Sequence, residues 1–420
     1  MIHGQRTARR STASPRPLTE TVSTHGCSAV LRRVDGPEAR EIYLHCRPPV
    51  PADDPGRQAE AIYRAIREVL DAETGGFGSV VVETIFLRDL PASIEPVREA
   101  RRRVLETCEA AGHRPATLEI EQPPLDERAC LEVSVQAVVP KTSPLRMATV
   151  AASPACGCAE CAGARGLQVD VGAERRFHAA GLCGPGDDAY QQTLGMFALA
   201  EQLLHRAGME FRDVMRTWIY LRHMDRDYGA LNRARRAFFE SRGIVPAPAS
   251  TGIGGGAASG SHDLCLGIYA VKAGRPLERT VMTSPTLNEA SEYGADFVRG
   301  MKVLETNKVA LHVSGTASID EHGATIHRGD LEAQADRMLL NIAALLGRQG
   351  ARFADVVHAI TYLKHAGDAP RIRAKLDSAG FAGFPHALVA APICRPDLLC
   401  ETEVLAVLPR SVEAPAVASA

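Results

Sequence analysis

One pattern of apolar and polar positions recurs three times along the chain. Segments rich in β-branched and aromatic residues, each opening with phenylalanine, stand at 77–88 (FGSVVVETIFLR), 211–222 (FRDVMRTWIYLR) and 353–364 (FADVVHAITYLK). This content favours a buried strand. Nineteen residues before each phenylalanine stands a glutamine, at Gln58, Gln192 and Gln334. Between glutamine and phenylalanine the apolar spacing is that of an amphipathic helix, so the pattern predicts a helix followed by a strand in each repeat.

Further elements extend each repeat to about 110 to 120 residues. A second helical stretch rich in Arg and Ala reads VREARRRVLE, LNRARRAFFE and RIRAKLDSAG, and closing strands are predicted at 130–140, 264–274 and 398–409. A hairpin-like pair precedes each first helix, as in VALHVSGTASI at 309–319. The sequence therefore predicts an α+β fold of three tandem β-β-α-β-α-β modules. Their bare sheet faces would pack together as a pseudo-threefold trimer in one chain.

These repeats define the expected domain boundaries. We divide the chain into a flexible tail at 1–26, module 1 at 27–140, a cysteine-rich joint at 141–175, module 2 at 176–273, a linker at 274–304, a catalytic module 3 at 305–409 and a flexible tail at 410–420. The arginines within 1–26 also resemble a transit peptide, but their Ser, Thr and Pro neighbours favour a tail.

Composition and charge narrow the classes of function. Apolar residues make up 45% of the 420 residues and charged residues 23%, as in a globular protein with a sizeable core. The net charge of −2 provides no general attraction to nucleic acid or to anionic lipid. No apolar stretch is long enough to cross a bilayer. We therefore expect a cytoplasmic protein whose partner is a small molecule, without nucleic acid or membrane.

The repeated Gln, Phe and Tyr-Leu spacings resemble the reactive-intermediate deaminase (Rid, or YjgF-like) superfamily over all three modules. Members of that superfamily usually form homotrimers with ligand clefts between neighbouring units. They place a carboxylate-binding arginine just after a Pro-Ala pair. Here the corresponding positions are Thr117, Ser250 and Ala387. The resemblance therefore implies the fold, whereas the missing arginine argues against ordinary imine hydrolysis.

A second resemblance is to chorismatases, which are single chains built on the same fold. The matching motifs are RTWIY (216–220), STGIGGG (250–256), VSGTASI (313–319), HRGDLEAQ (327–334) and ICRPDLLCETE (393–403). This resemblance implies cleavage of the enolpyruvyl ether of chorismate, or of a close relative, to pyruvate and a hydroxybenzoate-type product. It implies Glu401 as the catalytic acid. It also implies Cys394 and Gly315 as the residues found in members that release 3-hydroxybenzoate, where members that form a dihydrodiol tend to carry alanine.

The chemistry of enol ether cleavage also requires an acid. Cleaving an enol ether needs a proton on its methylene carbon, and a carboxyl group can supply it at neutral pH only if burial raises its pKa. Glu401 lies in an apolar strand with Glu403 on the same face, and two neighbouring carboxyls raise one pKa. The alternative is that both glutamates face solvent on an edge strand. Glu132 occupies the equivalent place in module 1 and Cys265 in module 2, so we expect one active cleft, in module 3.

A substrate with two carboxylates needs fixed cations and hydrogen-bond donors. The candidates for substrate binding are Arg216, Tyr220, Tyr293, Arg299, Arg395 and Glu403. Alternatives stay open for several: Arg395 could pair with Asp397 in a turn, the tyrosines could be ordinary buried residues, and Cys394 could be a small core residue. The segment SEYGADFVRGM at 291–301 also departs from the longer Tyr-Gly-Pro-Arg segment of chorismatases.

The joint after module 1 carries a cluster of thiols. Cys156, Cys158 and Cys161 could surround one soft cation, with Cys183 or His178 as a fourth ligand. This predicts a structural zinc site, and the alternative is a surface loop with exposed thiols. The chemistry itself requires no cofactor.

Two other functions stay open from the sequence. The protein could be a Rid-like enzyme acting on another small imine, amide or carboxylate, or a non-catalytic small-molecule-binding protein of the same fold. The pseudo-trimer could be a monomer or could associate into a homo-oligomer.

Overall fold

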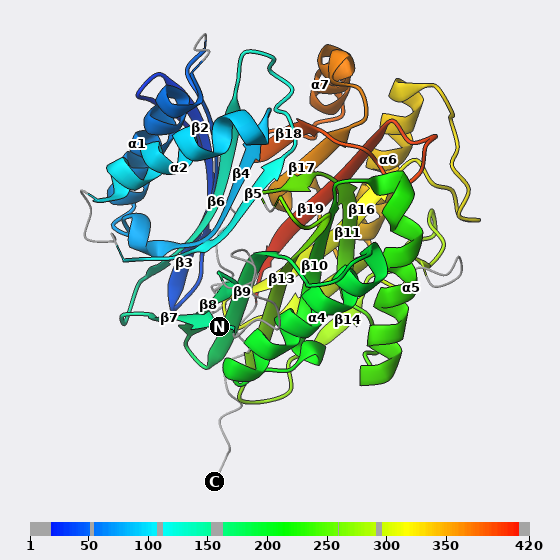
Figure 1. Cartoon of the computed structure of the whole chain (residues 1–420), viewed down its shortest axis with the longest axis horizontal. Coiled ribbons are helices and arrows are strands. Elements are labelled where there is room, and N and C mark those ends of the chain that lie inside the picture. The colour runs from blue at the N-terminus through cyan, green and yellow to red at the C-terminus, as the bar shows by residue number, and fades with distance from the viewer. Residues whose placement is uncertain are drawn as a thin grey trace, which may run out of the picture.

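Three β-sheets, each with two helices on its outer face, surround a common centre (Figure 1). The computed structural model describes residues 18–50, 54–106, 112–152, 163–258, 260–290 and 296–410. Separate apolar clusters fill the space between each sheet and its helices. The predicted α+β fold of three tandem modules is therefore confirmed.

The modules share one order of elements, except that module 2 has an additional two-residue strand, β12. Module 1 contains β1 (Leu18–Thr24), β2 (Cys27–Asp35), β3 (Ala39–Arg47), α1 (Pro55–Ala72), β4 (Val80–Leu87), α2 (Leu90–Glu106), β5 (Ala116–Glu121) and β6 (Leu131–Pro140). Module 2 contains β7 (Arg146–Ala151), β8 (Arg165–Val171), β9 (Glu174–Leu182), α4 (Ala189–Arg206), β10 (Val214–Leu221), α5 (Met224–Arg242), β11 (Ala249–Gly254), β12 (Gly256–Ala257) and β13 (Leu264–Ala273). Module 3 contains β14 (Arg279–Val281), β15 (Gly300–Leu304), β16 (Lys308–Ala317), α6 (Leu331–Gly347), β17 (Val356–Leu363), α7 (Ala369–Ser378), β18 (His386–Ala390) and β19 (Cys400–Pro409).

The observed unit is β-β-β-α-β-α-β-β, which corrects the predicted boundaries. The predicted tail 1–26 is wrong at its end, because β1 pairs with β2. The joint 141–175 holds β7 and β8, and the linker 274–304 holds β14 and β15. The segment 309–319 is mostly one strand, β16, rather than a pair. The outermost strands are short or mostly exposed, so their sequences lack the apolar alternation that identifies a buried strand.

The two repeated sequence signals have distinct structural roles. Each repeated phenylalanine begins a 3₁₀ turn, at Phe77–Ser79, Phe211–Asp213 and Phe353–Asp355, so the strands start three residues later than predicted. Each repeated glutamine connects the first helix to the backbone just before the last strand. The Gln334 side chain, for example, accepts from Leu399 N at 2.8 Å and donates to Asp397 O at 2.8 Å. These bonds anchor the start of the strand that bears Glu401.

The last strand of each module lies inside its sheet. β6 lies between β3 and β4, β13 between β9 and β10, and β19 between β16 and β17. The sheet edges also meet across the module boundaries: β12 pairs with β5, Ala249 bridges Val298, and Pro124 bridges Val389. The three contacts close the sheets into a ring. Because β19 lies between β16 and β17, its residues are shielded on both sides.

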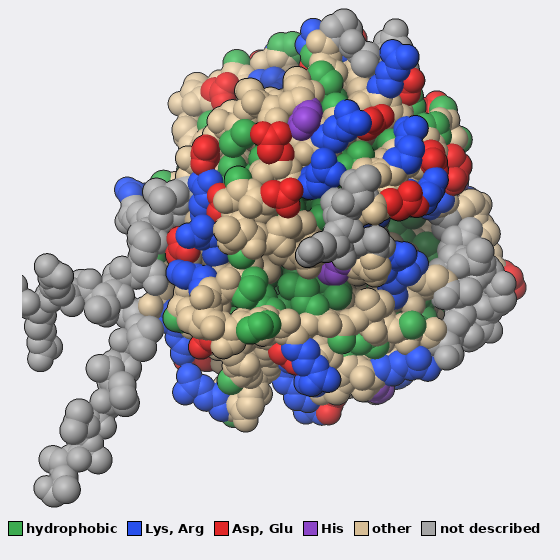
Figure 2. Space-filling model, turned by 90° about the vertical axis from the view of Figure 1, so that its left-hand side faces the viewer, with side chains coloured by type: hydrophobic (Ala, Val, Ile, Leu, Met, Phe, Trp, Pro, Cys, Tyr) green, Lys and Arg blue, Asp and Glu red, His purple; other side chains and the backbone are tan. Residues whose placement is uncertain are grey.

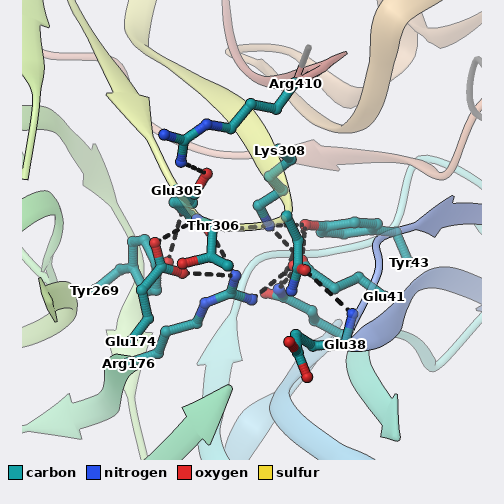
Figure 3. A network of polar contacts seen from close by, with 12 residues as sticks. Glu38, Glu41, Tyr43, Glu174, Arg176, Tyr269, Glu305, Thr306, Lys308 and Arg410 are labelled. Atoms are coloured by element: carbon teal, nitrogen blue, oxygen red, sulfur yellow. Dashed lines mark hydrogen bonds and ion pairs between the residues drawn. The ribbon is translucent and has the colours of Figure 1, made fainter. Parts of the chain in front are cut away.

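A buried network of charges joins the three modules near the centre (Figure 3). Arg176 Nη1 contacts Glu41 Oε1 at 2.6 Å, and Arg176 Nη2 contacts Glu305 Oε2 at 2.9 Å. Lys308 pairs with Glu41 as well, and the Tyr43 hydroxyl donates to Glu41 at 2.7 Å. Glu41 comes from module 1, Arg176 from module 2, and Glu305 and Lys308 from module 3. Correct charge pairing therefore depends on the assembly of all three modules.

The lengths of the helices and the distribution of surface charge bear on membrane and nucleic-acid binding. Among the helices of the described residues, none is long and apolar enough to cross a membrane. Basic and acidic side chains are interspersed over the visible face (Figure 2), as expected from the near balance of charge in the sequence.

Candidate active site

A cavity of about 180 Å³ lies between modules 2 and 3, and Glu401 lines it. Module 2 contributes residues of α5 and β11, and module 3 contributes residues of β16, β19 and the segments before β15 and β19. In the register of the sheet, Glu401 stands opposite Ala317 on β16 and Tyr362 on β17. The alternative of a solvent-facing edge strand is wrong, because β19 is an interior strand and Glu401 is only 4% exposed.

The surroundings of Glu401 favour its protonated form. Burial is the main cause, and the neighbouring Glu403 is the second; together they raise the pKa of Glu401 to about 8. Arg216, Arg299 and Arg395 act in the opposite direction, but their effects are smaller. A carboxyl with this pKa is mostly neutral at pH 7 and can donate a proton there.

Gly315 lies directly beneath the Glu401 carboxyl. A Cβ atom at residue 315 would come within 2.0 Å of Glu401 Oε1 and within 3.1 Å of Thr251 Cγ2. The Gly315 N–H donates to Thr251 Oγ1 at 3.0 Å, which fixes this stretch of β16 against β11 of module 2. Glycine at this position therefore provides the space that the acid occupies.

Cys394 lines the same cavity and is partly exposed. Burial, and then the nearby Glu401, raise the pKa of the Cys394 thiol to about 12, so it stays protonated at neutral pH. Its neutral S–H group faces the same space as the acid. Cys394 also packs against the apolar clusters of modules 2 and 3, so the structural role weighed from the sequence is present as well.

Two of the three arginines predicted to bind substrate line the cavity. Arg299 is 4% exposed and is oriented by Asn288, whose backbone oxygen accepts from Nε at 2.8 Å and whose Oδ1 accepts from Nη2 at 3.0 Å. Arg395 donates from Nη1 to Gly323 O at 2.7 Å. The neighbouring Asp397 pairs with Arg328, at 3.3 Å between Nε and Oδ2.

The other predicted binding residues do not line the cavity or fall outside the described residues. Arg216 and Glu403 pair with each other, at 2.9 Å between Nη2 and Oε2, and neither lines the cavity. Tyr220 is buried in the core and does not line the cavity, in agreement with the plainer interpretation. Tyr293 lies outside the described residues.

Sequence reasoning missed a stripe of residues on α5. Tyr228, Asn232 and Arg235 all line the cavity, and Arg235 is only 3% exposed. Phe297 lies between two of the cations: the Arg235 and Arg299 guanidinium carbons are 5.5 and 5.7 Å from its ring centroid. The signal was present in the sequence, because these three residues follow the i, i+4, i+7 spacing of one helix face.

The equivalent positions in the other modules have different surroundings. Phe86 stands opposite Glu132, and Tyr220 opposite Cys265, as Tyr362 stands opposite Glu401. The predicted equivalence of these positions is therefore confirmed. Glu132 Oε2 lies 2.9 Å from His45 Nε2, and Cys265 is fully buried. Among the described residues, a buried acid and the Cys394-Arg395 segment meet in the cleft of modules 2 and 3.

The predicted zinc site stays a prediction. Cys156, Cys158 and Cys161 lie outside the described residues. Cys183 is buried and lines a separate cavity of about 570 Å³ between modules 1 and 2, whereas His178 packs against Tyr269, with ring centroids 4.9 Å apart. The part of the chain that the structure describes contains no group of three His, Cys, Asp or Glu residues able to hold a metal ion.

Comparison with known proteins places this arrangement in a family. Residues 292–408 match the family described as Endoribonuclease L-PSP. A RutC family protein of Pyrococcus abyssi is 34% identical over 98 residues, which cover 23% of this chain and 76% of the relative. The chain therefore belongs to the RutC family, within the Rid superfamily that its repeats resemble.

Chorismatases are more specific relatives. The chorismatase of Streptomyces rapamycinicus is 32% identical over 189 residues, covering 40% of this chain and 54% of the relative, so the match spans about half of that protein. A crystal structure of chorismatase has the same fold, with a TM-score of 0.56 and 19% identity over 78% of this chain and 93% of the other. The protein is thus a homologue of chorismatase, as its motifs indicated.

Proposed function

We propose that the protein cleaves the enolpyruvyl ether of chorismate, or of a close relative, with Glu401 as the general acid. The main support is the position of a buried, largely neutral carboxyl group on the wall of the inter-module cavity. Its proton would pass to the methylene carbon of the enol ether. This leaves an oxocarbenium ion and an ionised Glu401.

The oxocarbenium ion is then trapped by a hydroxyl group. Addition of the neighbouring ring hydroxyl, followed by elimination, releases pyruvate and an aromatic hydroxybenzoate. Addition of water would instead release pyruvate and a dihydrodiol. In either route the hydroxyl proton lost on addition can return to Glu401, so the acid is regenerated. Gly315 and Cys394 support the first route, because they are the residues that resemble the 3-hydroxybenzoate-forming members.

The cations of the cavity suit a substrate with two carboxylates. Arg235, Arg299 and Arg395 line it, and guanidinium groups bind carboxylates through paired charge-assisted hydrogen bonds. The rival imine deaminase function has less support. Ser250 lines the cavity at the place where Rid deaminases carry their carboxylate-binding arginine.

Pyruvate release from chorismate, followed with a coupled lactate dehydrogenase assay, tests the proposal. We expect release by the wild type and a loss of about 10²-fold or more in Glu401→Gln, since glutamine cannot donate an acidic proton. Glu132→Gln is the matched control, because it changes the equivalent position in module 1 and should retain activity. Absence of release by the wild type, or wild-type release by Glu401→Gln, would refute the function, and calorimetry with cyclic carboxylates would then separate a binding protein from a different enzyme.

A further inference from the structure

Glu403 is held firmly by two donors from the neighbouring module. Its Oε2 accepts from Arg216 Nη2 at 2.9 Å, and its Oε1 accepts from Trp218 Nε1 at 2.8 Å. The Arg216 guanidinium also lies over the Trp218 ring, 5.1 Å from the centroid. Both donors belong to β10 of module 2, whereas Glu403 belongs to β19 of module 3. Contact between the two modules therefore fixes the position of this carboxylate.

Arg216 also supports the backbone at Gly315, which packs against the Glu401 carboxyl. Arg216 Nη2 donates to Thr251 Oγ1, and Thr251 Oγ1 accepts from Gly315 N at 3.0 Å. A chain of hydrogen bonds thus runs from Glu403 through Arg216 and Thr251 to the residue directly under the Glu401 carboxyl. Displacing Glu403 would disturb this support as well as the charge.

Glu403 and Arg216 lie outside the substrate cavity. Neither lines the cavity that contains Glu401, and both line a smaller cavity of about 90 Å³ together with residues of modules 1 and 3. A substrate in the inter-module cleft therefore does not reach them. Any effect of Glu403 on the reaction must pass through Glu401, its neighbour two residues earlier on the same face of β19.

We propose that Glu403, clamped by Arg216 and Trp218, is a positioning residue that keeps Glu401 in its acid form and aimed into the cleft. This inference rests on the proposed function. Side chains at i and i+2 on one strand are separated by about 6 to 7 Å. At that distance in a protein interior, a fixed like charge opposes ionisation strongly, because little water screens the pair.

The balance of charges around Glu401 supports this role. The groups facing it are Glu403 on its own strand, Arg216 on β10, Arg299 before β15, and Cys394 and Arg395 before β19, with Tyr362 opposite on β17. After burial, Glu403 is the largest cause that raises the pKa of Glu401, and its effect exceeds the opposing effect of Arg216. Removing the Glu403 charge also leaves Arg216 uncompensated, so both consequences lower the pKa of Glu401.

The first test is the pH dependence of kcat for pyruvate release by Glu403→Gln, which retains the shape of the side chain. The wild-type rate should fall as pH rises through the pKa of the acid, about 8. In the variant we expect this basic limb to move down by about one to two pH units. Glu83→Gln is the matched control, because Glu83 is a fully buried carboxylate paired with Arg101 in module 1. If kcat of Glu403→Gln falls at the same pH as kcat of the wild type, the proposal is overturned.

The second test does not depend on turnover. Infrared difference titration of the ligand-free protein, with Glu401→Gln as the reference that identifies the carboxyl band, measures the protonation midpoint of Glu401 directly. A lowered midpoint in Glu403→Gln supports the positioning role even if chorismate is not the substrate. An unchanged midpoint in a wild type and variant that both release pyruvate overturns the positioning role alone.

A double variant covers the case in which Glu403→Gln does not fold. Arg216→Met with Glu403→Leu removes both charges, so no unpaired buried ion remains. We expect a lowered Glu401 midpoint, by less than in Glu403→Gln, because the opposing arginine is also gone. A midpoint equal to that of the wild type would contradict the proposal.

Discussion

The carboxyl of Glu401 occupies the volume that a side chain at Gly315 would fill. A Cβ at residue 315 would lie 2.0 Å from Glu401 Oε1, far closer than non-bonded atoms approach. Since Thr251 closes the other side of this space, the glutamate rather than the strand must move if a side chain is added. The identity of residue 315 therefore controls where the acid points.

Gly315→Ala should displace the acid and slow the reaction. We expect kcat for release of the aromatic hydroxybenzoate to fall about 10²-fold, because a shift of about 1 Å in a catalytic group has effects of that size. Gly347→Ala serves as the control, since a Cβ there meets no atom within 4 Å. A wild-type kcat in Gly315→Ala would show that the acid does not depend on this space.

Glu401→Gln should stabilise the protein at alkaline pH while it abolishes catalysis. The folded-state pKa of Glu401, about 8, lies above its ordinary value of 4.5, so the neutral form contributes stability that is complete below pH 4.5. This contribution is lost as pH rises through 8, because the buried carboxyl must then ionise. Relative to wild type, we expect Glu401→Gln to gain about 3 to 5 kcal/mol in free energy of unfolding between pH 4.5 and pH 8.5.

Urea unfolding at a series of pH values measures this difference. Glu132→Gln, at the equivalent position of module 1, serves as the comparison variant. A stability difference between Glu401→Gln and wild type that does not vary with pH would contradict the raised pKa.

Arg235→Met should weaken substrate binding. Because Arg235 is buried at the cavity and stacked on Phe297, its guanidinium can meet a substrate carboxylate without reorganising. Loss of a charge-assisted hydrogen bond predicts a decrease of about 10- to 100-fold in kcat/KM for chorismate, mainly through KM. Arg233→Met, which changes an exposed arginine on the same helix, should have little effect. An unchanged KM would remove Arg235 from the binding set.

Glu41→Gln should destabilise the assembly of the three modules. Burial alone would raise the pKa of Glu41, but Lys308 and Arg176 hold it below its ordinary value. The substitution leaves two buried cations undercompensated, and breaking such a pair costs about 3 to 5 kcal/mol. Denaturant unfolding at neutral pH measures the loss, and Glu210→Gln, in an exposed pair with Arg212, should cost less than about 1 kcal/mol. Equal stability of Glu41→Gln and wild type would show that the network does not hold the modules together.

The sequence predicted the repeats and the candidate acid Glu401 because short local motifs mark both. The recurring glutamine and phenylalanine mark the same contacts in every module, and Gln334 anchors the strand that carries Glu401. The β-branched and aromatic segments predicted the interior strands. The outer strands β1, β7 and β14 were assigned to tails or joints, because polar, half-exposed strands differ little from loops in composition.

By itself, the sequence determined the three-module architecture, the family resemblance and the candidate residues Glu401 and Gly315. Only the tertiary structure decided which cations face that acid. It turned Arg216 away to pair with Glu403, brought Arg235 from the adjoining module into the cleft, and gathered the network around Glu41 and Arg176. The physical reason is that periodicity encodes which face of an element is buried, whereas contacts between modules depend on how whole sheets pack.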